Sequence, residues 1–120
     1  MNGSVDEGGR ALIQIEVAAA AQGRSTRLTG WIDTGFTGEL VLPESMVTDL
    51  GLKKAGTVNA ALGDGSTVLM DLYICFINWC GEQKQIVAAA NSGQYPLIGV
   101  GLLQGKRLEV DYSSKTVEIE

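Results

Sequence analysis

The sequence contains no histidine among its 120 residues. This absence excludes serine and cysteine hydrolases that use an imidazole base, and it excludes histidine-ligated zinc sites. Any catalysis must therefore depend on other side chains, chiefly carboxylates, lysine, tyrosine, serine or cysteine.

Cationic residues and cysteines are also few. Nine lysines and arginines oppose fourteen acidic residues, which gives a formal net charge of −5 and predicts no nucleic-acid partner. The two cysteines, Cys75 and Cys80, could form a disulfide or remain reduced, and the reduced state is favoured because free cysteine is a common buried apolar residue. Without histidine or further cysteines they make a poor zinc site, so we expect neither a metal nor another cofactor.

Long apolar runs are missing as well. The first residues are polar and acidic, unlike a secretory signal, and no apolar run is long enough to span a membrane. These features predict a cytoplasmic protein with no membrane partner. Residues 1–10 are expected to be a disordered segment, and residues 11–120 a single domain.

Short extended segments dominate the remaining chain. Residues 12–17 alternate between apolar and polar, residues 24–32 read as a second strand, and a hairpin turn is expected between them. Residues 43–51 predict a short helix, with proline in the first turn and Gly51 at the end. Residues 107–120 predict a closing hairpin.

Two further segments complete the prediction. Around Asp64-Gly65 the sequence predicts a hairpin with a type I′ turn. The apolar run from Leu72 to Trp79, and Trp31, are expected in the core. Many short strands with regular turns and one short helix predict a compact all-β barrel or sandwich.

The triplet Asp33-Thr34-Gly35 is the most distinctive motif. It follows an apolar strand, and a buried carboxylate is costly unless hydrogen bonds satisfy its oxygens. Taken alone, the triplet is most simply a turn that the aspartate caps. The alternative is a functional carboxylate, since glycine lets a backbone N–H approach it and threonine adds a hydroxyl.

The order of several motifs resembles that of the retropepsin-like aspartic peptidases, the group that holds the retroviral proteases and small prokaryotic relatives. These motifs are the Asp33 triplet, the glycine-tipped hairpin about thirty residues later and Leu97-Ile98-Gly99. The resemblance covers about residues 12–120. It implies a small closed β-barrel of the retropepsin type, with one or two short helices; the second helix corresponds to residues 100–104.

The resemblance also implies roles for single residues. Asp33 would be catalytic, Thr34 and Gly35 would support it, and Leu97, Ile98 and Gly99 would pass behind the catalytic loop. The substrate would contact the flap and the cleft, at Phe36, Thr37, Leu62, Gly63, Asp64 and Gly65. Retroviral members usually have a small and then an acidic residue after the triplet, where this chain has Phe36 and Thr37.

One Asp-Thr-Gly triplet supplies only one carboxylate, whereas the chemistry needs two that share a proton. A symmetric homodimer would bring the second Asp33 and place Thr34 across the interface. The resemblance thus implies an aspartic endopeptidase, a hydrolase that acts on a peptide or protein substrate as a homodimer. The alternative is a catalytically silent module of the same fold that serves in peptide binding or self-association.

Overall fold

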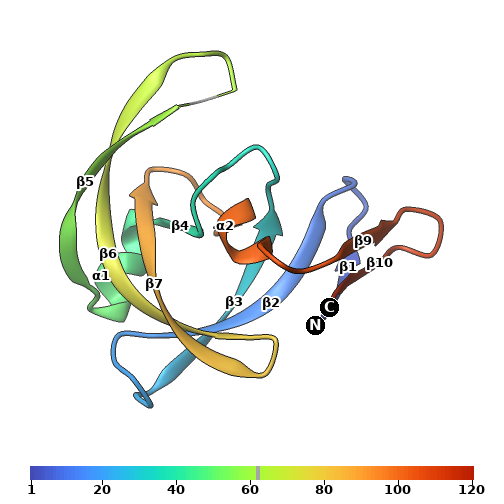
Figure 1. Ribbon diagram of the computed structural model, residues 1–120, viewed down its shortest axis with the longest axis horizontal. Helices are drawn as coiled ribbons and strands as arrows, with labels where there is room; N and C mark the ends of the chain where they lie inside the picture. The colour runs from blue at the N-terminus through green and yellow to red at the C-terminus, as the bar shows by residue number, and fades with distance from the viewer. Residues whose placement is uncertain (62) are drawn as a thin grey trace.

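A computed structural model describes residues 1–61 and 63–120. Strands make up 55% of the chain and helices 9%, which confirms the predicted all-β class with short helices. Figure 1 shows the strands curving around a centre that holds the second helix. The elements in chain order are β1 (Asn2–Val5), β2 (Ala11–Ala18), β3 (Ser25–Ile32), β4 (Leu40–Pro43), α1 (Glu44–Leu50), β5 (Lys53–Ala61), β6 (Thr67–Trp79), β7 (Glu82–Asn91), β8 (Leu97–Ile98), α2 (Val100–Leu103), β9 (Leu108–Asp111) and β10 (Thr116–Ile119).

Six of these strands pair into a closed ring. The order is β2, β3, β8, β4, β7 and β6, and β6 returns to β2 through the pairs from Glu16–Asn78 to Ala18–Phe76. Alternating residues of each strand point into the ring, so Ile13, Ile15 and Val17 are buried while Gln14 is exposed. The main core lies inside this ring.

The helix α1 begins and ends where the sequence predicts. Pro43 precedes its first turn, and Gly51 ends it in the left-handed conformation with φ 68°. Only Val47 of the helix is fully buried. Among the described residues, none of the helices has the length and apolar character needed to cross a lipid bilayer.

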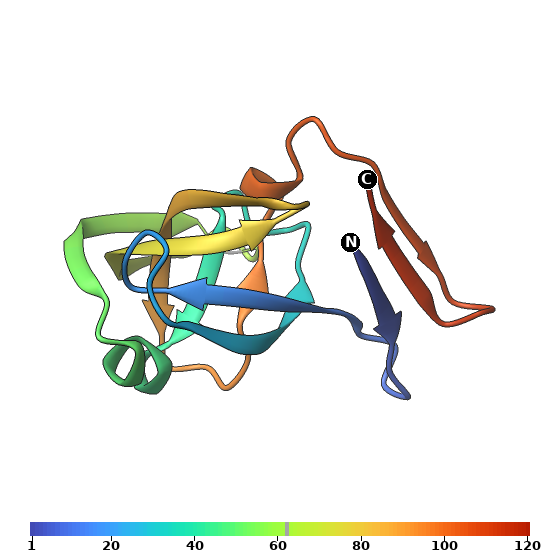
Figure 2. The same ribbon diagram turned by 90° about the horizontal axis from the view of Figure 1, so that it is seen from below.

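Strands β1, β9 and β10 form an extension at one end of the molecule, next to both chain termini (Figure 2). β1 pairs antiparallel with β2 on one side and with β10 on the other, with Gly3 opposite Ile13 and Val117. The prediction that residues 1–10 are disordered is therefore wrong for Asn2–Val5. Their order depends on pairing with β2 and also with β10, more than a hundred residues away, and local polarity does not reveal this pairing.

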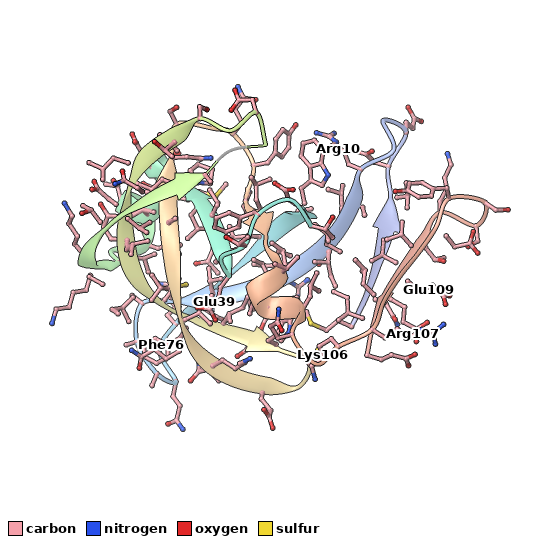
Figure 3. All side chains as sticks on the ribbon, turned by 45° about the horizontal axis from the view of Figure 1, so that its top comes forward. Arg10, Glu39, Phe76, Lys106, Arg107 and Glu109 are labelled. Carbon is pink, nitrogen blue, oxygen red and sulfur yellow. The ribbon has the colours of Figure 1, made fainter. Side chains whose placement is uncertain are left out.

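The outer face of this extension is charged. Arg107 and Glu109 lie on it (Figure 3), with the guanidinium Nη2 2.9 Å from the carboxylate Oε2. Such exposed pairs contribute little to stability, but they place charge on β9 and next to it, and β9 is the last strand of the sheet. Charged side chains on an edge strand discourage pairing with other chains.

Candidate active site

Asp33 is the first residue after β3, and its backbone is fixed by β8. Its N–H donates to the carbonyl oxygen of Ile98 at 2.8 Å, which continues the parallel pairing of Trp31 and Ile32 with β8. Its own carbonyl oxygen accepts from the Phe36 N–H at 3.2 Å and closes a turn. The position of the carboxyl group is thus set by the sheet and not by a free loop.

The carboxylate of Asp33 is partly buried and is oriented by one local hydrogen bond. Its Oδ1 accepts from the Gly35 N–H at 2.9 Å, and a Cβ at Gly35 would lie 3.2 Å from the same oxygen. Within the described part of the chain no lysine or arginine pairs with Asp33. One carboxylate oxygen is therefore engaged, and the other is open to water or to a second carboxyl group.

The segment Leu97–Gly99 lies directly behind this loop. The N–H of Gly99 donates to the Glu39 carbonyl oxygen at 2.9 Å, and the Val100 N–H donates to the Phe36 carbonyl oxygen at 2.9 Å. A Cβ at Gly99 would overlap both the Gly38 carbonyl oxygen and the Phe36 ring. The two segments approach so closely only because position 99 has no side chain.

A pocket of about 430 Å³ opens between Asp33 and the hairpin formed by β5 and β6. In Figure 1 this hairpin arches over the centre of the molecule. The lining of the pocket is mostly apolar and consists of Asp33, Gly35, Phe36, Val41, Glu44, Ala60, Ala61, Gly63, Val68, Leu69, Met70, Ala90, Asn91, Ser92 and Leu97. The structure thus brings the predicted catalytic carboxylate and the β5–β6 hairpin to one cleft, with Gly63 of the predicted flap in its lining.

The tip of the hairpin differs from the predicted turn. A type I′ turn needs positive φ at both central residues, but only Gly65 has it, with φ 86°. Instead Oδ1 of Asp64 accepts hydrogen bonds from both the N–H and the hydroxyl of Ser66. The hydroxyl bond and then the backbone bond lower the pKa of the Asp64 carboxyl. Leu62, predicted to contact substrate, lies outside the described residues.

Several predicted contact residues do not line this cleft. Asp64 and Gly65, at the hairpin tip, are absent from its lining, and so is Thr34, which was predicted to support Asp33 and is exposed beside it. Thr37 lines a different pocket, of about 440 Å³, on the far side of Phe36. Phe36 itself borders both pockets and forms part of the wall between them.

Most of the residues that line the cleft were not predicted from the sequence. Val41 belongs to β4, whose neighbours Leu40 and Leu42 belong to the main core, while Val41 packs with Met70 and Ala89 in a second cluster. The alternation of a strand could have placed Val41 on that opposite face. No local signal marks Met70 or Asn91, because their places depend on how β6 and β7 cross the ring.

A further pocket, of about 360 Å³, also borders Asp33 and is lined by Trp31, Ile32, Asp33 and Leu97. Trp31 is 38% exposed, so its predicted core position is wrong. The ring packs edge-on against Tyr95, with centroids 6.5 Å apart. The core prediction for Leu72–Trp79 holds for one face, where Cys75, Ile77 and Trp79 are buried.

Arg10 completes this aromatic group (Figure 3). Its guanidinium carbon lies 4.8 Å from the Tyr95 ring centroid and 5.6 Å from that of Trp31. Its Nε also pairs with Oδ2 of Asp6 at 2.7 Å. No sequence pattern connects the loop of Asp6 and Arg10 with Trp31 and Tyr95, because these three segments are far apart in the chain.

Among the described residues, no three or more cysteine, aspartate or glutamate side chains gather closely enough to hold a metal ion. Both cysteines are free thiols, in agreement with the predicted reduced state. The ionisable group that the geometry singles out is therefore Asp33.

The sequence matches no protein-family model and no curated protein. Solved structures are similar in fold. A retropepsin-like aspartic protease from Rickettsia conorii superposes with a TM-score of 0.66 at 17% identity, over 98% of this chain and 86% of that one. EIAV protease, in complex with the inhibitor HBY-793, gives a TM-score of 0.65 at 18% identity, over 83% of this chain and 90% of that one.

A third match lies in a much longer protein. The foamy viral protease-reverse transcriptase, in complex with an RNA/DNA hybrid, gives a TM-score of 0.55 at 19% identity, and the match covers 83% of this chain but 13% of that one. Together with the closed ring, the loop behind Asp33 and the hairpin over it, these matches lead to one conclusion. The chain has the fold of the retropepsin-like aspartic proteases.

Proposed function

We propose that this protein is an aspartic endopeptidase that is active as a homodimer. One observation carries the proposal: Asp33, held rigidly by β8, lies in a largely apolar cleft beneath the β5–β6 hairpin. A cleft of this kind can hold an extended peptide, with its scissile bond beside the carboxylate. Similar solved structures include a retropepsin-like aspartic protease from Rickettsia conorii.

The chemistry explains why a second subunit is needed. Two carboxyl groups about 3 Å apart cannot both ionise and therefore share one proton. The ionised group takes a proton from water while its neighbour donates one to the peptide carbonyl oxygen, so that water oxygen bonds to the carbonyl carbon. When the C–N bond then breaks, the pair gives a proton to the leaving nitrogen and takes one from a hydroxyl of the tetrahedral diol, so the products are an acid and an amine and the pair again holds one proton.

Symmetric dimerisation would supply the second carboxyl group. A twofold axis next to the Asp33 loop places the same residue of both subunits together. Thr34 is exposed there, and its hydroxyl makes no hydrogen bond within the described part of the chain. It is free to bond across the axis and hold the two loops in register.

Peptide cleavage by the Asp33→Asn variant tests the proposal. The wild type is expected to cleave a peptide mixture between about pH 4 and pH 7. Pepstatin should block this cleavage, and the Asp33→Asn variant should lack it. Asp49→Asn, which removes the same charge from the exposed face of α1, is the control and should retain activity. Full activity of Asp33→Asn would refute the proposal.

A catalytically silent module remains the alternative. Phe36 favours it, because this large aromatic residue directly follows the Asp33 triplet and lines the cleft. A wild-type protein that binds peptides, stays monomeric at micromolar concentration and cleaves none of them would establish that alternative.

A further inference from the structure

The charged groups of the cleft have one sign. Its described lining includes two carboxylates, Asp33 and Glu44, and neither lysine nor arginine. Glu44 opens α1, and its carboxylate forms no ion pair or hydrogen bond within the part of the chain that the structure describes. Asp33 is assigned to the reaction, which leaves Glu44 without a role.

Strand β4 sets the separation of the two carboxylates. Its first residue, Leu40, pairs with Ile98, whose carbonyl oxygen also binds the Asp33 N–H. Its last residue, Pro43, pairs with Asn91, and Glu44 follows directly. Three strand steps span about 10 Å, so Asp33 and Glu44 lie toward opposite ends of one pocket.

The pocket changes character along this line. Val41, halfway along β4, pairs with Leu97 and packs with Met70, so this part of the lining is apolar, whereas Pro43 at the end of β4 pairs with Asn91 and brings Glu44 near Asn91 and Ser92. A long aliphatic stem with a cationic head fits such a gradient, because the methylenes are buried and the head meets the carboxylate. An acidic side chain would place like charge against Glu44.

We propose that the cleft selects substrates whose lysine or arginine side chain reaches the Glu44 end of the pocket. Glu44 is the residue that determines this preference. The inference rests on the proposed peptidase function, whose scissile bond lies beside Asp33. Glu44 is exposed, so solvent screens the ion pair and the effect on kcat/KM is moderate.

Matched peptides test the preference. A cleaved peptide is varied at each position in turn on either side of the scissile bond, with lysine, norleucine or glutamate at that position, and kcat/KM is measured. At one position the wild type should prefer lysine over norleucine by about fivefold, as expected for a solvent-exposed ion pair, and should disfavour glutamate. Glu44→Gln should lose the lysine advantage, so that the lysine and norleucine peptides are cleaved with similar kcat/KM.

Two variants make the result specific. Glu44→Lys should reverse the preference toward the glutamate peptide. Asp49→Asn removes a charge from the same helix but does not line the pocket, so it should keep the lysine preference. Loss of the preference in Asp49→Asn as well would mean that net charge, not Glu44, attracts the peptide, and would overturn the inference.

The remaining outcomes separate the two proposals. If Asp33-dependent cleavage occurs but lysine and norleucine peptides react alike at every position, the inference fails and the peptidase function stands. If no peptide is cleaved, the peptidase function fails, and fluorescence anisotropy of labelled lysine and norleucine peptides then decides the preference on the uncleaved complex. Equal affinities there, or a lysine preference that survives Glu44→Gln, would overturn the inference.

Discussion

At the scale of single residues, Gly99 shows how the site depends on the absence of a side chain. Its backbone is extended, with φ −91° and ψ 172°, a conformation open to any residue. A side chain is excluded because its Cβ would overlap the Gly38 carbonyl oxygen and the Phe36 ring. Glycine is therefore needed at position 99 because the neighbouring segments leave no room for a Cβ, and not because of its backbone dihedral angles.

Gly99→Ala should therefore destabilise the protein by about 1–3 kcal/mol, the usual cost of overpacking. Urea denaturation monitored by tryptophan fluorescence measures this loss. Gly8→Ala is the matched control, because a Cβ there makes only an ordinary contact with Asp6, 3.5 Å away. Equal denaturation midpoints for the wild type and Gly99→Ala would contradict the close approach.

Cys75 gives a second prediction, through pH. Burial raises the pKa of its thiol from the ordinary 9.0 to about 11. The unfolded thiol ionises first as the pH rises, so the folded state binds more protons, and stability falls between about pH 9 and pH 11. Two pKa units correspond to about 2–3 kcal/mol.

Denaturation curves between pH 8 and pH 11 measure this slope, and Cys75→Ala should flatten it. Tyrosines and lysines also ionise in this range, so the comparison with the variant isolates the thiol. A variant with the same slope as the wild type would show that Cys75 does not cause it.

At the scale of elements, the β5–β6 hairpin combines weak packing with contact to the cleft. Leu69 is 65% exposed, yet it lines the pocket beside Asp33. An exposed leucine contributes little to folding, so its place over the cleft suggests a role in holding substrate.

Leu69→Ser should leave the free energy of unfolding within about 0.5 kcal/mol of the wild type. In the proposed peptidase it should raise KM several-fold and change kcat much less, because the contact is to bound substrate and not to the reacting bond. Tyr112→Ser, at 66% exposure in the terminal hairpin, is the control and should change neither constant. A normal KM for Leu69→Ser would mean that the hairpin does not cover the substrate.

At the scale of the whole molecule, the proposed activity belongs to a pair of chains. Each subunit contributes one Asp33, so a heterodimer of wild type and Asp33→Asn lacks one of the two carboxyl groups. Such a heterodimer should be inactive.

Wild type mixed with an equal amount of Asp33→Asn, then allowed to exchange subunits, should fall from about half to roughly a quarter of the activity of wild type alone at the same total protein concentration, because a quarter of the pairs are wild type under random assembly. Peptide cleavage before and after exchange measures it. Mixing with Asp49→Asn should cause no such loss. Half of the activity, as expected for independent monomers, would contradict a shared site.

The sequence alone was sufficient for the features that depend on neighbouring residues. The alternation of residues 12–17, the proline and glycine around α1 and the turn in residues 107–120 each predict an element that the structure contains. The Asp33 triplet could be picked out for the same reason, because an acidic residue between an apolar strand and Thr-Gly stands out locally.

Tertiary structure alone decided what those elements make together. It ordered Asn2–Val5 by pairing them with β10, turned Trp31 outward beside Tyr95, and set Val41, Met70 and Glu44 around one pocket with Asp33. Each depends on segments distant in the chain that meet only when the ring closes. Local patterns carry information on conformation, whereas the composition of a cleft is a property of long-range packing.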